Sequence, residues 1–356
     1  MKQFSQKGYT MLLAMMIIAL IIFLVTNVAD KSRIHTRYLK TVIDREKAKA
    51  LAYSGIEIAK SQLANMEQNS KQAKKQEKMS QDEKSKQFIR NFLPKANQWQ
   101  MFRLTKKNDG VAGTLKICIG CEDGKINLNK MFDFTNKKFF SDKIDCKKVI
   151  HQVFEKAKKF VGDKNLMGPF EKFLKERQNK LYDPTELLDI EDFNGFASSV
   201  FFDPDGFFAS DSNKVKQTIY LNDLFTLWSF TRELNPWFFS NSLKVLFGLK
   251  VLKAGDSKLE DKKLQELLKQ FKSELTWPNS WKQLLLPLYG KEFGSLPKEV
   301  GMLMSTKFEP RVFSVLSYGT VGNVTQKLLV IIERVAQSNS SGGTSFEFRA
   351  KKFYWL

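Results

Sequence analysis

Histidine is almost absent from this chain of 356 residues, which contains two, and cysteine and proline are scarce, at three and nine. With only His35 and His151 present, a histidine-based catalytic or metal centre has almost no candidate residues. The sequence also lacks the GxSxG, HExxH, P-loop and dinucleotide-binding fingerprints. We therefore expect no enzyme activity and interpret both histidines as surface residues.

The three cysteines are Cys118, Cys121 and Cys146. The CIGC spacing matches half of a zinc site, but no second Cys or His pair follows at the usual distance. It also lacks the βαβ context of a thioredoxin-like redox motif. If the folded part is exported, the three cysteines allow one disulfide and leave one thiol over.

Acidic residues are outnumbered, because 58 Lys and Arg face 38 Asp and Glu and give a net charge of +20. Such a charge attracts nucleic acid, anionic lipid or acidic protein surfaces. Much of the charge comes from lysines dispersed along polar stretches such as KQAKKQEKMSQDEKSKQ (71–87), which contains no aromatic residue. We interpret that tract as a solvated, flexible segment and expect no nucleic-acid partner.

One apolar run stands near the N-terminus. Every residue from Met11 to Val25 is apolar, and no charged residue occurs from Gly8 through Ala29. A helix of that length just spans a bilayer core of about 30 Å, so we expect one membrane-spanning segment. Charges flank both ends of the run, so the positive-inside rule leaves the orientation open.

The helical pattern continues beyond this run. No proline occurs between Gly8 and Phe92. One helix face is marked by residues that follow each other at three- and four-residue steps: Ile34, Tyr38, Val42, Arg45, Ala48, Ala52, Ile56, Ala59 and Leu63. We therefore expect one helix from about residue 9 to about residue 66. Its first half would lie in lipid, and its second half would be the spine of a folded domain.

The remaining sequence alternates between strand and helix patterns. Residues 114–132 read as a hairpin with a turn at Asp123–Gly124, and 141–300 is mainly helical. The last sixty residues contain three β-rich runs. Strands split by an inserted block should share one sheet, since neither group would otherwise bury its apolar face. Trp228, Phe230 and residues 237–239 are interpreted as core of the helical block.

The N-terminus resembles a prepilin (class III) signal, in which a basic leader ends in glycine directly before the apolar helix. The resemblance implies that prepilin peptidase cuts between Gly8 and Tyr9, that the apolar helix is retained, and that Tyr9 is N-methylated. Most pilins and pseudopilins carry glutamate at the fifth mature position, where this chain has Leu13. A carboxylate in lipid is costly unless it is paired. In pilins the glutamate pairs with the charged amino terminus of the neighbouring subunit, and the resemblance implies that a subunit with Leu13 cannot make that pairing.

Three further segments resemble the general secretion pathway protein K family. Its members are large minor pseudopilins of type II secretion systems, and they lack the glutamate at the fifth mature position. The segments are AKALAYSGIEIAKSQL (48–63), CEDGKINLN (121–129) and FSVLSYGTVGNVTQKLLVIIER (313–334). The resemblance implies a tip-capping subunit that helps to initiate the periplasmic pseudopilus for protein export. It also implies a single-pass inner-membrane protein with most of the chain in the periplasm. Expected partners are other minor pseudopilins, the assembly platform and prepilin peptidase.

The resemblance and the patterns together predict an α+β, pilin-like fold: a long N-terminal transmembrane and spine helix, a C-terminal antiparallel sheet and a large inserted helical domain. The expected divisions are a leader (1–8), a transmembrane helix (9–29), its periplasmic continuation (30–66), a charged flexible segment (67–93), first strands (94–140), an inserted helical domain (141–300) and closing strands (301–356).

The family's inserted domain usually carries an acidic loop associated with calcium. The nearest equivalent here is FFDPDGFF, in which Asp203 and Asp205 precede a glycine and are candidate calcium ligands. Turn formation alone also explains that order, and the glutamate that closes an EF-hand loop is missing. Calcium is the one cofactor that the sequence suggests.

Two alternatives remain open. The first is a minor pilin of a type IV pilus or DNA-uptake filament, whose lysines would contact phosphate. The second is a membrane-anchored periplasmic enzyme, in which two carboxylates would act as acid and base. Its candidate residues are Glu122, Asp123, Asp189, Glu191 and Asp192.

Overall fold

The computed structural model describes residues 4–67, 80–162, 164–196, 218–251, 264–338 and 344–355. Its α-helices are α1 (Phe4–Glu67), α3 (Gln81–Phe92), α4 (Lys106–Asp109), α5 (Leu128–Met131), α6 (Cys146–Val161), α7 (Met167–Glu176), α8 (Leu221–Leu224), α9 (Asn241–Phe247), α11 (Trp277–Leu284), α12 (Leu286–Tyr289) and α13 (Lys298–Met302). Short 3-10 helices are η1 (Glu122–Gly124), η2 (Pro184–Asp189), η3 (Glu191–Gly195), η5 (Pro236–Phe238) and η6 (Phe293–Ser295).

The strands form one main sheet and two short pairs. They are β1 (Trp99–Leu104), β2 (Gly113–Cys121), β3 (Ile126–Asn127), β4 (Phe132–Asp133), β5 (Lys138–Phe139), β6 (Phe225–Thr226), β7 (Val312–Val321), β8 (Val324–Ser338) and β9 (Thr344–Trp355). The main sheet has the order β1-β2-β7-β8-β9, and all of its strand pairs are antiparallel. Strands from both sides of the insertion therefore share one sheet, as the sequence predicts.

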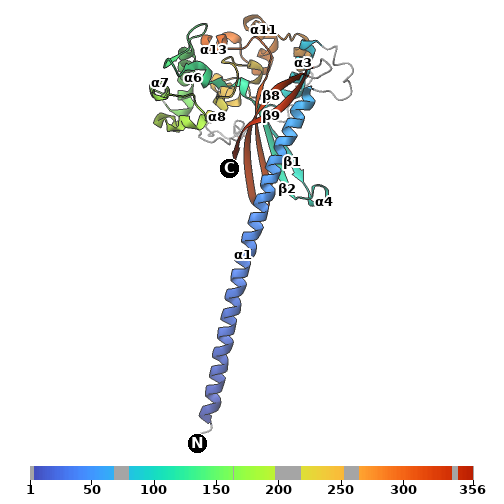
Figure 1. The fold of residues 1–356 in the computed structure, drawn as a ribbon, viewed down its shortest axis with the longest axis vertical. Helices are drawn as coiled ribbons and strands as arrows, with labels where there is room; N and C mark the ends of the chain where they lie inside the picture. Colours follow the sequence, from blue (N-terminus) through green and yellow to red (C-terminus); the bar gives the residue numbers. More distant parts are fainter. Residues whose placement is uncertain are drawn as a thin grey trace.

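Helix α1 is a single helix of 64 residues, about 96 Å long at the usual rise per residue. Figure 1 shows its N-terminal half projecting from the head and its C-terminal half lying along the sheet. The packed half buries one stripe of small and aliphatic residues at three- and four-residue spacing: Ala48, Ala52, Ile56, Ala59 and Leu63. The earlier part of the predicted stripe, at Ile34 and Tyr38, is exposed instead.

Glycines let α1 approach the sheet closely. A Cβ atom on Gly319 of β7 would lie 2.3 Å from the carbonyl oxygen of Ala48, and one on Gly55 would lie 2.1 Å from the Ser317 hydroxyl. Gly319 is therefore required by close approach of the two backbones, whereas Gly55 makes room for the side chains of Ser317 and Leu115.

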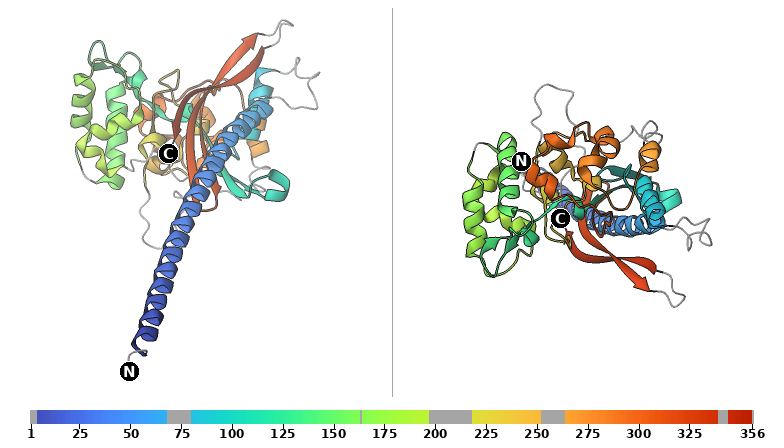
Figure 2. Two further views of the ribbon diagram at one scale, coloured as in Figure 1. Left: turned by 60° about the horizontal axis from the view of Figure 1, so that its bottom comes forward. Right: turned by 90° about the horizontal axis from the view of Figure 1, so that it is seen from above.

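The insertion leaves and re-enters the sheet at adjacent points. Strand β2 ends at Cys121 and β7 begins at Val312, and Cys121 pairs with Phe313 across the two strands. Part of the intervening chain, at Phe225 and Trp228, packs on the face of the sheet opposite α1, where it lines a small cavity with Ile331. Another part, at Phe238, contacts Phe92 of α3. Figure 2 shows the green helices of the insertion, α6 and α7, to one side of the sheet and of α1. Ser317 faces α1, whereas Ser314 lines a small cavity between the sheet and the insertion.

The α+β class, with a long N-terminal apolar helix and a C-terminal antiparallel sheet, is confirmed. Two local predictions are wrong. The segment 67–93 was predicted to be flexible, but its described part forms α3, which buries Phe88, Ile89 and Phe92. Phe92 lies edge-on to both Phe238 and Phe313, so apolar packing holds α3 against the insertion and the sheet.

The predicted hairpin at 114–132 is also wrong. Strand β2 pairs with β1 and β7, and η1 turns the chain away from the sheet. Strand β3 pairs in parallel with β6, a hundred residues later, and β4 pairs with β5. Of the predicted first strands (94–140), only β1 and β2 belong to the main sheet.

Candidate functional site

The apolar half of α1 is the first candidate functional surface. Helix α1 is the one described helix that is long and apolar enough to cross a membrane. The mean hydropathy of its most apolar window is 2.8, and no part of that window is buried. Tyr9, at the predicted cleavage site, is 72% exposed, and Leu13 lies on the same free part of the helix. The Gly8–Tyr9 peptide lies within the first turns of α1.

Apolar side chains remain exposed on α1 beyond the predicted membrane span. Tyr38 is 66% exposed, and Ile34, Leu39 and Ile43 are also exposed. Because these side chains lie between the lipid span and the head, neither lipid nor the sheet of this chain covers them. Ile34 and Tyr38 share one face of the helix, whereas Ile43, nine residues after Ile34, points to the opposite face. Exposed apolar area therefore surrounds this part of α1 and is available for contact with other proteins.

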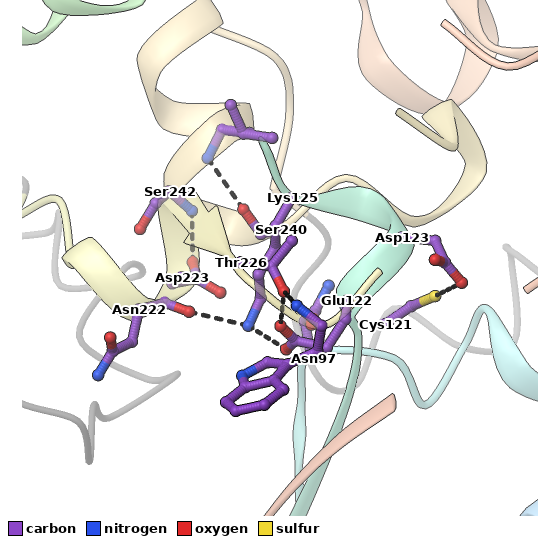
Figure 3. Close-up of polar contacts among 12 residues, drawn as sticks. Asn97, Cys121, Glu122, Asp123, Lys125, Asn222, Asp223, Thr226, Ser240 and Ser242 are labelled. Carbon is purple, nitrogen blue, oxygen red and sulfur yellow. Dashed lines mark hydrogen bonds and ion pairs between the residues drawn. The ribbon is translucent and has the colours of Figure 1, made fainter. Parts of the chain in front are cut away.

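The second candidate is a buried polar cluster where the insertion meets the sheet (Figure 3). The carboxylate of Glu122 and the ammonium of Lys125 form an ion pair of 2.5 Å, and their side chains are only 3% and 5% exposed. Lys125 also donates to the carbonyl of Asn222 at 2.8 Å, and the Thr226 hydroxyl donates to Glu122 at 2.6 Å. The pair thus ties η1 to the segment that contains α8 and β6.

Asp123 connects the same turn to the sheet. Its carboxylate accepts the Ser229 hydroxyl at 2.8 Å and the backbone N–H groups of Arg311 and Val312 at 2.7 and 3.2 Å. Burial raises the pKa of Asp123, and these hydrogen bonds oppose that rise. The residue therefore joins the exit of β2, the Ser229 loop and the entry of β7.

Gly124 permits the closest backbone approach at this junction. A Cβ atom there would lie 1.8 Å from the carbonyl oxygen of Phe238. The carbonyl of Gly124 accepts the Ser240 N–H at 3.3 Å, and the Asn235 N–H donates to the Asp123 carbonyl at 2.7 Å. The EDGKIN segment therefore acts as a structural connector.

Two further charged groups are buried nearby. The Asp223 carboxylate accepts the Ser242 N–H at 2.6 Å, and burial raises its pKa. Burial lowers the pKa of Lys244 to about 8, although the carboxylate of Asp223 opposes that change. The Lys244 ammonium lies 5.8 Å from the centre of the Tyr289 ring.

The predicted disulfide is not formed, because all three cysteines are buried free thiols. Cys118 and Cys121 lie on the same strand, three residues and about 10 Å apart, which exceeds the span of a disulfide. Cys146 begins α6, in the insertion. Burial raises the pKa of Cys121 well above its ordinary value, so this thiol is unreactive.

The candidate acid–base residues do not form one site. Glu122 and Asp123 are buried and engaged as described, whereas Asp189 and Glu191 are exposed on η2 and η3. Asp192 lies 3.8 Å from the Lys164 ammonium. Across the described ranges, no group of three or more His, Cys, Asp or Glu residues is arranged to hold a metal ion. The candidate calcium ligands Asp203 and Asp205 lie outside the described residues.

Sequence reasoning missed the partners of this cluster. Thr226, Ser229 and Asn222 are about a hundred positions from Glu122 and carry no motif of their own. One signal is present in residues 122–125, where two acidic residues, a glycine and a lysine stand between apolar runs. Charged side chains in such a position are buried only when they are paired, so each of them is expected to have a partner.

No protein-family model and no curated protein matches the chain. One similar solved structure is the crystal structure of the GspK-GspI-GspJ complex from the type 2 secretion system of enterotoxigenic Escherichia coli. The match has a TM-score of 0.35 and 14% sequence identity, and it covers 90% of this chain and 99% of that chain.

Proposed function

We propose that this protein is a minor pseudopilin of a type II secretion system, which caps the tip of the periplasmic pseudopilus and helps to initiate its assembly. Its N-terminal helix would be held in the inner membrane, and the head would lie in the periplasm. The observation that carries the proposal is α1 itself, one unbroken helix with a free apolar half and a half packed along an antiparallel sheet.

Two features support a place at the tip. The insertion enlarges the head to one side of the sheet and of α1 (Figure 2), and such bulk would block a further subunit above it. Leu13 stands where a carboxylate would pair with the amino terminus of a neighbouring subunit, so this chain does not need a subunit above it for charge pairing. Its work is assembly through helix packing, and no catalytic step is involved.

The exposed apolar surface of α1 gives the test of assembly. Tyr38→Asp is expected to reduce co-purification with the other minor pseudopilins at least about tenfold, because a charge would enter a helix–helix contact. Thr36→Asp, two residues before Tyr38 and also exposed, lies on the opposite side of the helix and is the control for the added charge. Co-purification from detergent-solubilised membranes, with far-UV circular dichroism to check folding, measures both variants.

Two outcomes would contradict the proposal. One is that the wild-type chain fails to co-purify with any other minor pseudopilin. The other is co-purification with the subunits of a type IV pilus instead, which would favour the minor-pilin alternative.

A further inference from the structure

A groove of about 1160 Å³ opens at the end of the head that is farthest from the N-terminus of α1. It lies between the last turns of α1, helix α3 and the helical residues 264–269. Figure 1 shows α3 at the opposite end of the molecule from the projecting half of α1. Met66, which lines the groove, lies about 55 Å along α1 from Ala29, too far for contact with lipid headgroups.

Four cationic side chains line this groove: Lys86, Arg90, Lys95 and Lys269. None of them forms an ion pair with any residue that the structure describes. Some exposed cations elsewhere have partners: Lys147 and Lys175 both bind Glu171 at less than 3 Å. In the groove, four cations face a described lining in which Glu83 is the one carboxylate, so its net charge is positive.

The carboxylates near the groove are already engaged. Glu83, the one acidic residue in its lining, accepts the Ser80 N–H at 3.1 Å and completes a capping box at the start of α3. Asp82, one turn before Lys86, accepts the Ser273 N–H at 2.6 Å. Hydrogen bonds from the Ser273 side chain and backbone N–H lower the pKa of Asp82, and the nearby Lys86 ammonium lowers it further.

The rest of the lining is rich in amides, which suits a peptide. Asn65, Gln87, Asn91 and Gln265 contribute both donors and acceptors. The amide nitrogen of Gln87 has no hydrogen-bond partner among the described residues. No Phe, Tyr or Trp is among the described residues that line the groove, so this lining offers no ring on which a nucleic-acid base would stack.

We propose that this groove binds an extended acidic segment of a partner protein. The four cations would pair with Asp or Glu side chains, and the amides would bond to the peptide backbone. The groove volume exceeds that of a typical small-molecule pocket, which favours a peptide segment. This binding site goes beyond the proposed role in assembly and does not depend on it.

The test uses the full-length chain in non-ionic detergent and a fluorescein-labelled peptide of about ten alternating Glu and Ser residues. Fluorescence anisotropy is expected to show binding that the double variant Lys86→Glu, Arg90→Glu weakens at least about tenfold. The matched control is Lys106→Glu, Lys107→Glu on α4, which makes the same change in net charge on exposed lysines outside the groove. The control is expected to retain affinity within about twofold, and far-UV circular dichroism checks that both variants fold.

Each other outcome would overturn the proposal. Equal weakening in both double variants would mean non-specific attraction by the net charge of +20. Equal binding of a matched Gln and Ser peptide would mean that charge does not direct recognition. Tighter binding of a single-stranded oligonucleotide of the same length, lost in the groove variant, would assign the groove to nucleic acid instead.

Discussion

Glu122→Ala is expected to lower the free energy of unfolding of the head by about 3–5 kcal/mol, because it leaves the Lys125 ammonium buried without its carboxylate. The Thr226 hydroxyl would lose its acceptor in the same variant. Denaturant unfolding of the full-length chain in detergent, followed by tryptophan fluorescence, measures this loss. The six tryptophans include the buried Trp237 and Trp281.

Two comparisons show whether burial is the cause. Glu122→Leu combined with Lys125→Met removes both charges and is expected to cost less than Glu122→Ala alone. Glu274→Ala breaks an exposed ion pair with Lys307, at 4.0 Å, and is expected to cost less than about 1 kcal/mol. Equal losses for Glu122→Ala and Glu274→Ala would contradict the role assigned to the buried pair.

Gly124→Ala is expected to destabilise the head by at least about 3 kcal/mol. The added Cβ would lie 1.8 Å from the carbonyl oxygen of Phe238 and 2.4 Å from its carbonyl carbon, and both atoms are backbone. Relief of this clash requires η1 and η5 to separate, which also breaks the hydrogen bond from Ser240 to Gly124. The insertion should therefore loosen from the sheet, while the packing of α1 on β7 is retained.

The control for this substitution is Gly294→Ala in η6. A Cβ at Gly294 meets no atom within 4 Å, so the change in stability is expected to stay within about 0.5 kcal/mol. Thermal unfolding by near-ultraviolet circular dichroism measures both variants. A Gly124→Ala chain that unfolds at the wild-type temperature would show that the connector is not closely packed.

The sequence alone predicts the long helix and the sheet on which it packs. The spacing of Ala48, Ala52, Ile56 and Ala59 identifies the packed stripe of α1, because helical periodicity is a local signal. The joining of the two strand groups in one sheet follows from the need to bury their apolar faces. Gly8 and Tyr9 are identified by their position next to the apolar run, but their processing is not visible in the structure.

Other elements depend on signals that composition hides. Helix α3 lies in a lysine- and glutamine-rich region, yet Ser80 and Glu83 form a capping box that marks its start. The spacing of Phe88 and Phe92 marks its buried face. Here apolar packing against distant rings outweighs the polar composition.

The connector at 121–127 was misread for a different reason. An Asp-Gly pair between apolar runs is a strong local hairpin signal, and it favoured a turn at Asp123 and Gly124. The partners that determine its actual conformation, including Thr226 and Phe238, are a hundred or more positions away. Local patterns contain no information about such contacts.

The most direct test of the proposed function is the mass of the N-terminal peptide of the chain purified from membranes that contain prepilin peptidase. We expect the chain to begin at Tyr9 with a methylated amino group, and Gly8→Val to leave the full leader in place. The apolar half of α1 would be retained in both products. An intact Met1 in the wild-type chain, or a cut after the apolar run, would contradict the assignment of this protein as a pseudopilin.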